Sequence, residues 1–76
     1  MISIYPNPTS NEISIKSTED VENIKVYSAS GILIKSILSI RKGELGYLNF
    51  KDVSSGMYFL KVLVNGKEII KKVIIN

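Results

Sequence analysis

The sequence predicts an all-β fold, an Ig-like antiparallel β-sandwich of about seven short strands. Apolar and polar residues alternate with a period close to two in most segments of the 76-residue chain. Turn residues, chiefly Gly and Asn, separate these segments about every 8–12 residues. Within the segments, β-branched residues dominate. Two packed antiparallel sheets allow such strands to bury their apolar faces, so a sandwich is the natural architecture.

The first three strands follow from short alternating runs. We expect a strand at residues 2–4 that ends where Pro6 and Pro8 remove two backbone donors and break the ladder. Residues 12–16 alternate next, and residues 23–28 alternate again after a polar connection. Each of these runs places its isoleucines and valines on a single face.

The remaining strands are separated by glycine turns. Gly31, which we expect at positive φ, leads into a strand at residues 32–40, and a further strand is expected at 44–51. Residues 57–64 form the strongest strand of the chain. Asn65-Gly66 then predicts a type I′ hairpin turn, with residues 68–75 as the returning strand.

The alternation also predicts which side chains form the core. They are expected to be Ile13, Ile15, Ile24, Val26, Leu48, Phe50, Tyr58, Leu60 and Val62. Tyr58 follows a Ser-Ser-Gly turn at the start of the most apolar strand. This position predicts an anchoring tyrosine whose hydroxyl bonds the loop backbone, as at sandwich corners.

Charge and composition argue against several classes of protein. The net charge is +3, and the ten basic residues are spread along the chain, whereas a small nucleic-acid binder clusters them on one face or helix. We therefore expect no nucleic-acid binding. No apolar run is long enough for a transmembrane helix, so we expect no membrane insertion either. We also expect any export signal to lie on a longer parent chain.

The residues that most enzymes need are missing. The chain has no histidine and no cysteine, which removes the commonest general base and the commonest transition-metal ligands. Glu19, Asp20 and Glu22 indicate a solvated turn rather than a cation site, because the alternating acidic pattern of a calcium loop is absent. The five glycines are scattered singly, so no phosphate-binding loop is present. We therefore expect no catalysis, no metal and no cofactor.

Four landmarks along the chain occur in a recognisable order. They are Tyr5-Pro6-Asn7-Pro8-Thr9, then Ile24-Lys25-Val26-Tyr27 with its turn at Gly31, then the run from Asp52 to Val62 containing Gly56-Met57-Tyr58, and finally Lys71-Lys72-Val73-Ile74-Ile75. This series resembles the type A C-terminal sorting domain of the type IX secretion system of Bacteroidota. The resemblance covers nearly the whole chain.

The resemblance implies a role in protein sorting. Such a domain lies at the C-terminus of a secreted protein, behind an N-terminal cargo domain that enters the periplasm through its own signal. It is recognised by the type IX machinery, and the cargo then crosses the outer membrane to the cell surface or the medium. A sortase-like cysteine peptidase usually removes the domain. We accordingly expect residues 1–76 to be a single sorting domain from a longer secreted protein.

The residues that match the family motifs fall into two groups. Asn7 matches the opening motif together with its two flanking prolines. The residues expected to determine the fold, which need not contact a partner, are Pro6, Pro8, Gly31, Gly56 and Tyr58. Lys71 and Lys72 differ from these because adjacent strand residues point to opposite faces, so at least one lysine should be exposed to a receptor. The terminal strand could also offer its edge for strand addition.

Two other functions remain open at this point. One is a carbohydrate- or surface-binding sandwich appended to a secreted enzyme, which an exposed pair of aromatic side chains would favour. The chain has no Trp, but Tyr27 and Tyr47 could lie on exposed faces. The other is a spacer domain, which a smooth polar surface and a buried tail would favour.

Overall fold

Seven strands form two antiparallel sheets in the computed structural model, which describes residues 1–5, 12–37 and 39–76. The strands are β1 (Ile2–Tyr5), β2 (Glu12–Ser17), β3 (Asn23–Ser28), β4 (Leu33–Ile37), β5 (Leu45–Asn49), β6 (Gly56–Val64) and β7 (Lys67–Ile75). No helix occurs in the described ranges. The predicted all-β sandwich is therefore confirmed, while the motif residues Pro6, Asn7 and Pro8 lie outside the described residues.

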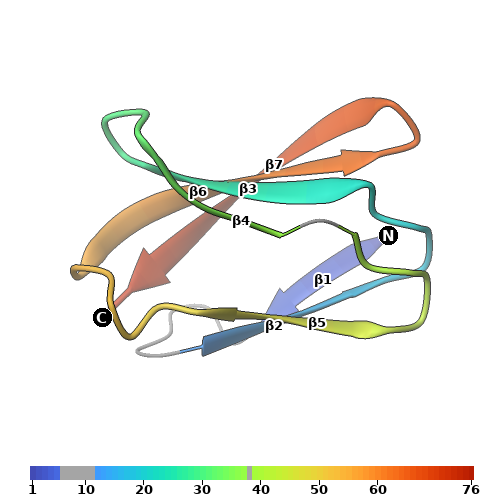
Figure 1. Cartoon of the computed structure of the whole chain (residues 1–76), viewed down its shortest axis with the longest axis horizontal. Coiled ribbons are helices and arrows are strands. Elements are labelled where there is room, and N and C mark those ends of the chain that lie inside the picture. Colours follow the sequence, from blue (N-terminus) through green and yellow to red (C-terminus); the bar gives the residue numbers. More distant parts are fainter. Residues whose placement is uncertain (6–11, 38) are drawn as a thin grey trace.

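The two sheets are stacked, with β1-β2-β5 in one and β4-β3-β6-β7 in the other. Figure 1 shows the four-stranded sheet above and the three-stranded sheet below. In the lettering of immunoglobulin domains, β1, β2 and β5 correspond to strands A, B and E, while β3, β6 and β7 correspond to C, F and G. The connections β2–β3, β4–β5 and β5–β6 cross from one sheet to the other. This strand order makes the sandwich Ig-like.

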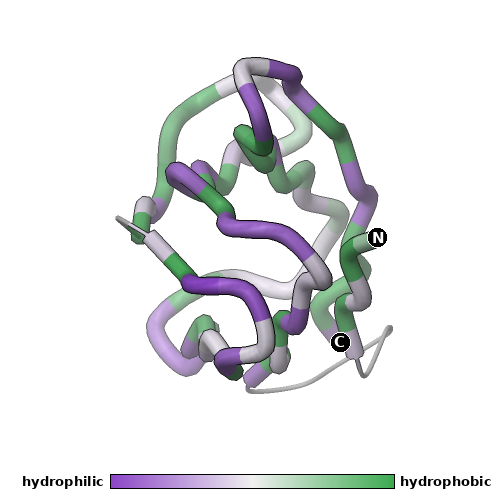
Figure 2. The backbone as a smooth tube through the Cα atoms, turned by 90° about the vertical axis from the view of Figure 1, so that its right-hand side faces the viewer, coloured by the Kyte–Doolittle hydropathy of each residue, from purple (hydrophilic) through white to green (hydrophobic). Residues whose placement is uncertain are grey.

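The core lies between the sheets and contains every residue that the alternation placed there. All nine predicted core side chains are buried, and the core cluster also includes Ile2, Val21, Ile40, Val64, Val73 and Ile75. Figure 2, which looks along the sandwich from one end, shows hydrophobic and hydrophilic residues following each other along the strands. The period-two pattern in the sequence is thus the direct cause of the two-layer fold.

One long-range contact closes the sandwich at the end where β2 leaves the three-stranded sheet. Val21 and Ile40 form an isolated antiparallel bridge, with N–H to O distances of 2.8 and 3.1 Å. The side chain of Ile40 fills the space above Gly46, where an added Cβ would lie 2.2 Å from Ile40 Cδ1. β4 spans only Leu33–Ile37, so the predicted strand at 32–40 is shorter than expected, and Ile40 pairs with Val21 instead.

The glycine turns have the predicted backbone geometry. Gly31 has a φ of 90°, and its N–H donates to the carbonyl of Ser28 at 2.9 Å. Asn65 and Gly66 have φ values of 51° and 73°, as a type I′ turn requires. These two turns set the β3–β4 and β6–β7 pairings that build the four-stranded sheet.

Candidate functional site

The corner before β6 is built by two of the motif residues. The hydroxyl of Tyr58 donates to the carbonyl of Ser54 at 2.6 Å, and its ring packs against Phe50 with centroids 6.3 Å apart. Gly56 starts the strand at a φ of 150°, a conformation that favours glycine. Tyr58 is therefore the tyrosine of an Ig-type corner, as its position in the sequence indicated.

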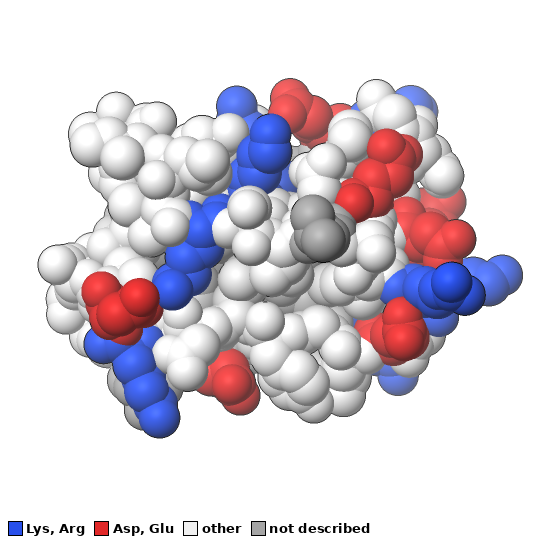
Figure 3. All heavy atoms as spheres, in the orientation of Figure 1, with Lys and Arg blue, Asp and Glu red and all other residues white. Residues whose placement is uncertain are grey.

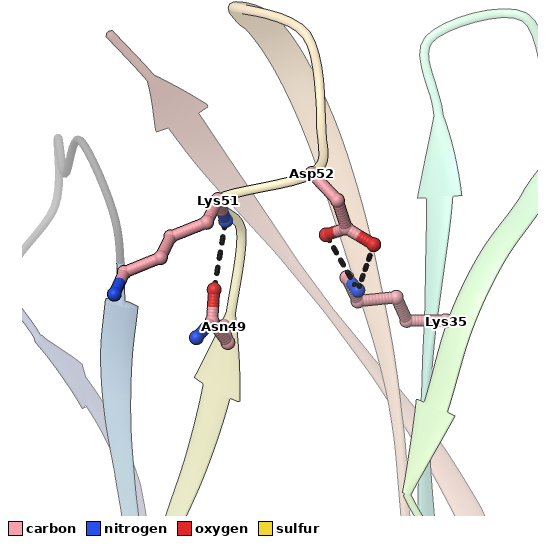
Figure 4. A network of polar contacts seen from close by, with 4 residues as sticks. All are labelled: Lys35, Asn49, Lys51 and Asp52. Atoms are coloured by element: carbon pink, nitrogen blue, oxygen red, sulfur yellow. Dashed lines mark hydrogen bonds and ion pairs between the residues drawn. The ribbon is translucent and has the colours of Figure 1, made fainter.

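An ion pair ties the same corner to the other edge of the sandwich. Lys35 on β4 places its Nζ 2.9 Å from Oδ1 and 3.2 Å from Oδ2 of Asp52, in the loop between β5 and β6 (Figure 4). The hydrogen bond from Lys35 is the main reason that the pKa of Asp52 lies below its ordinary value, and a backbone hydrogen bond and the Lys35 charge act in the same direction. Next to it, Asn49 Oδ1 accepts a hydrogen bond of 2.8 Å from the N–H of Lys51.

Both tail lysines are exposed, and they point to opposite faces of β7. Lys71 pairs with the buried Leu60 and so lies on the inner side of the sheet, where its side chain is nevertheless exposed. Lys72 pairs with Phe59 on the outer side. β7 is an edge of the four-stranded sheet, so a partner that contacted both lysines would have to reach around that edge.

The register brings the described motif residues to one end of the four-stranded sheet. Ser28, at the start of the Gly31 turn, pairs with Tyr58, which pairs with Val73. The row beside it contains Tyr27, Phe59 and Lys72. Figure 1 shows the β3–β4 turn, the start of β6 and the C-terminus at the same end of the molecule. Gly31, Gly56, Tyr58 and Lys72 thus lie toward the same end of the molecule although they are far apart in sequence.

A shallow hollow of about 360 Å³ lies on the outer face at this end. It is lined by Tyr27, Phe59, Lys61, Ile70 and the β3–β4 turn, including Gly31. The Nζ of Lys61 lies over the ring of Tyr27, 5.0 Å from its centroid. Sequence reasoning missed this hollow, because its residues come from three separate segments of the chain that only the strand order places together.

Most carboxylates lie at the opposite end of the molecule, toward the right in Figure 3. Asp20 accepts a hydrogen bond from the N–H of Lys42, Glu22 accepts one from Gly66, and Glu19 accepts one from the side chain of Asn65. These carboxylates satisfy loop donors, in agreement with the solvated turn expected from the sequence. In the described part of the chain no group of three or more His, Cys, Asp or Glu side chains could hold a metal ion.

The outer face of the three-stranded sheet carries two exposed tyrosines. Tyr5 and Tyr47 flank Ser14 across β1, β2 and β5, and they are 46% and 54% exposed. The charged side chains on this face are Lys16 and Glu12 among the described residues. No helix in the described ranges is long and apolar enough to cross a membrane.

Fold and geometry together define a small Ig-like β-sandwich whose described motif residues lie toward one end of its larger sheet. Comparison with protein families finds the secretion system C-terminal sorting domain, whose family model matches residues 3–76. The chain belongs to this family, the C-terminal sorting domains of the type IX secretion system. It is a family of sorting signals rather than of enzymes, and such a signal implies a secreted or surface-exposed protein with a cargo domain on the same chain. A comparison with curated proteins finds no match.

Proposed function

We propose that this domain carries an N-terminal cargo domain of the same chain across the outer membrane through the type IX machinery, and that a sortase-like cysteine peptidase then removes it. The observation that carries the proposal is the match of residues 3–76 to the family of secretion system C-terminal sorting domains. Gly31, Gly56, Tyr58 and Lys72, which match the family motifs, lie toward one end of the four-stranded sheet. Gly31, Gly56 and Tyr58 act by building this end of the sheet. The exposed tail beside them is the part that the machinery contacts.

The edge of β7 is the contact that best uses both lysines. Lys71 and Lys72 project to opposite faces of this edge strand. A strand added beside β7 would therefore have one ammonium group near each of its two faces. Main-chain hydrogen bonds would supply affinity that does not depend on the cargo. The two ammonium groups would orient the partner and fix its register.

The test is a reporter with a periplasmic export signal, fused ahead of residues 1–76. We expect the reporter at the cell surface or in the medium of a host with a type IX system, and no transport in an otherwise identical strain that lacks it. Equal export in both strains, or none in either while the fusion is folded, would refute the sorting role. Deleting the peptidase should leave the domain attached, which the mass of the fusion would reveal.

A second candidate function is carbohydrate binding on the three-stranded sheet. Tyr5 and Tyr47 lie on one face with Ser14 between them, so the strands that carry them are about 9–10 Å apart. Two rings at this spacing could stack on neighbouring units of a glycan. Affinity electrophoresis on cell-wall polysaccharides tests this function: Tyr47→Ala should abolish retardation, and migration independent of the polysaccharide would eliminate it.

A further inference from the structure

The outer face of the four-stranded sheet combines positive charge with exposed apolar surface. Two neighbouring rows of side chains cross it, and we call them together the lysine–aromatic face. One row consists of Ser36, Lys25, Lys61 and Ile70, and the other of Leu33, Tyr27, Phe59 and Lys72. The hollow described above lies within this face.

Lys25 and Lys61 are directly opposite each other on the two central strands. Like charges in this position destabilise an antiparallel pair. Neither row contains a carboxylate, and Glu68 is on the next row toward the hairpin. The Tyr27 ring under the Lys61 ammonium offsets part of the repulsion. The fold thus keeps a charge arrangement that lowers its own stability, which is expected where a surface serves binding.

The apolar side chains on the same face are unusually open. Ile70 is 59% exposed and Leu33 is 52% exposed. Leu33 pairs with the half-buried Tyr27, and Ile70 lines the hollow together with Tyr27 and the half-buried Phe59. A solvated sheet face normally carries polar side chains. An exposed apolar patch with a polar rim is typical of an interaction site.

We propose that the lysine–aromatic face is a docking surface for an acidic protein segment that places an apolar or aromatic side chain in the hollow. Carboxylates of the segment neutralise Lys25 and Lys61, and its apolar side chain covers Phe59 and Ile70. The charge of the face selects an anionic partner, and its hollow selects a peptide over a simple polyanion. That this partner belongs to the secretion machinery rests on the proposed function. The preference of the face for an acidic segment with an apolar side chain does not.

The first test separates recognition from stability. Lys25→Glu places a carboxylate opposite Lys61, so the variant should unfold at the same temperature as the wild type or a higher one. Its export as a reporter fusion should nevertheless fall by about tenfold or more, because a charge at the docking surface is reversed. Lys16→Glu is the matched control, since it makes the same change at an exposed strand lysine on the other sheet and should export within about twofold of the wild type.

The second test measures binding without secretion. The isotope-labelled 76-residue chain is titrated with a peptide of alternating Asp and Phe, and amide shifts should concentrate at Tyr27, Phe59 and Ile70. A peptide with Lys in place of Asp should cause no shifts, and Lys25→Glu should weaken the binding of the Asp peptide by about tenfold or more. Equal shifts with inorganic polyphosphate would indicate a general anion surface and overturn the peptide partner. Shifts confined to the three-stranded sheet, or none, would overturn the site.

The two proposals fail in different ways. If the wild type is exported only with the type IX system and Lys25→Glu matches Lys16→Glu, the docking surface is wrong and the sorting role stands. If the wild type is not exported at all, the sorting role is wrong, and the peptide titration still decides whether the face binds an acidic segment.

Discussion

Strands β3 and β6 present two faces that differ in almost every property. On the inner face Ile24, Val26, Leu60 and Val62 are fully buried. On the outer face the same strands place Lys25 opposite Lys61 and Tyr27 opposite Phe59. One face thus holds the sandwich together, while the other carries a like-charge pair that the fold does not need. The comparison implies that stability and recognition can be changed separately on a single pair of strands.

The largest effect is expected on the inner face. Leu60→Ala should lower the free energy of unfolding by about 2–5 kcal/mol, because a fully buried leucine leaves a cavity when it is truncated. Leu63→Ala, on the outer face of the same strand, is the matched control and should cost less than about 1 kcal/mol. Chemical denaturation of both variants measures the difference. Similar losses for the two would show that the faces do not differ in the way proposed.

The corner tyrosine comes next. Tyr58→Phe keeps the ring but removes the hydroxyl that donates to the Ser54 carbonyl, so it should cost about 0.5–1.5 kcal/mol. Tyr27→Phe makes the same chemical change on the outer face and should alter stability by less than about 0.5 kcal/mol. If chemical denaturation gave Tyr58→Phe the smaller loss, the corner hydrogen bond would contribute nothing to the difference between the faces.

Alternation in the sequence was sufficient to predict the inner face. Because side chains alternate between the two faces of a strand, the pattern alone indicates which of them point toward the core. Ile13, Leu48 and Leu60 could therefore be assigned to the core without knowing which strands pair. The contact between Val21 and Ile40 could not be predicted in this way. It joins a residue after a polar connection to one beyond the end of β4, and only the closed sandwich brings them together. The need for glycine at position 46, where the side chain of Ile40 leaves no room for a Cβ, could not be predicted for the same reason.

The outer face was less predictable, and the reason is strand order. The motifs indicated Gly31 and Lys72 separately, and Lys25 and Lys61 read as ordinary solvated lysines. Only the order β4-β3-β6-β7 places Lys25 opposite Lys61 and brings Ile70 to the hollow beside the Gly31 turn. A pattern with a period of two assigns side chains to faces, but it does not say which strands are neighbours.

Substitutions at Lys71 and Lys72 test whether the secretion machinery contacts the lysine–aromatic face or the edge of β7. The double change Lys71→Ala and Lys72→Ala keeps the backbone ladder, so the free energy of unfolding should shift by no more than about 1 kcal/mol. Export of the fused reporter should fall sharply. Of the single changes, Lys72→Ala should reduce export more, because Lys72 lies on the lysine–aromatic face as well as beside the edge of β7, whereas Lys71 lies on the inner side. Equal losses would show that the edge of β7 is contacted without the lysine–aromatic face. Wild-type export from the folded double variant would overturn both contacts and direct the search to the segments near Asn7 and Ser55.

The smallest effect is expected at the rim of the sandwich, where Lys35 holds Asp52. The pKa of Asp52 is lower in the folded chain than its ordinary value of 3.8, so the carboxylate stabilises the fold above that value. This contribution should disappear as the pH falls through the lowered pKa, where the folded carboxyl also becomes protonated. Asp52→Asn should therefore be slightly less stable than the wild type at neutral pH, and the two unfolding curves should converge in acid. In a Lys35→Gln background the hydrogen bond that is the main cause of the shift is missing, and the same substitution should show a much weaker dependence on pH. A gap between Asp52→Asn and the wild type that stayed constant into acid would show that the ion pair does not join β4 to the corner in solution.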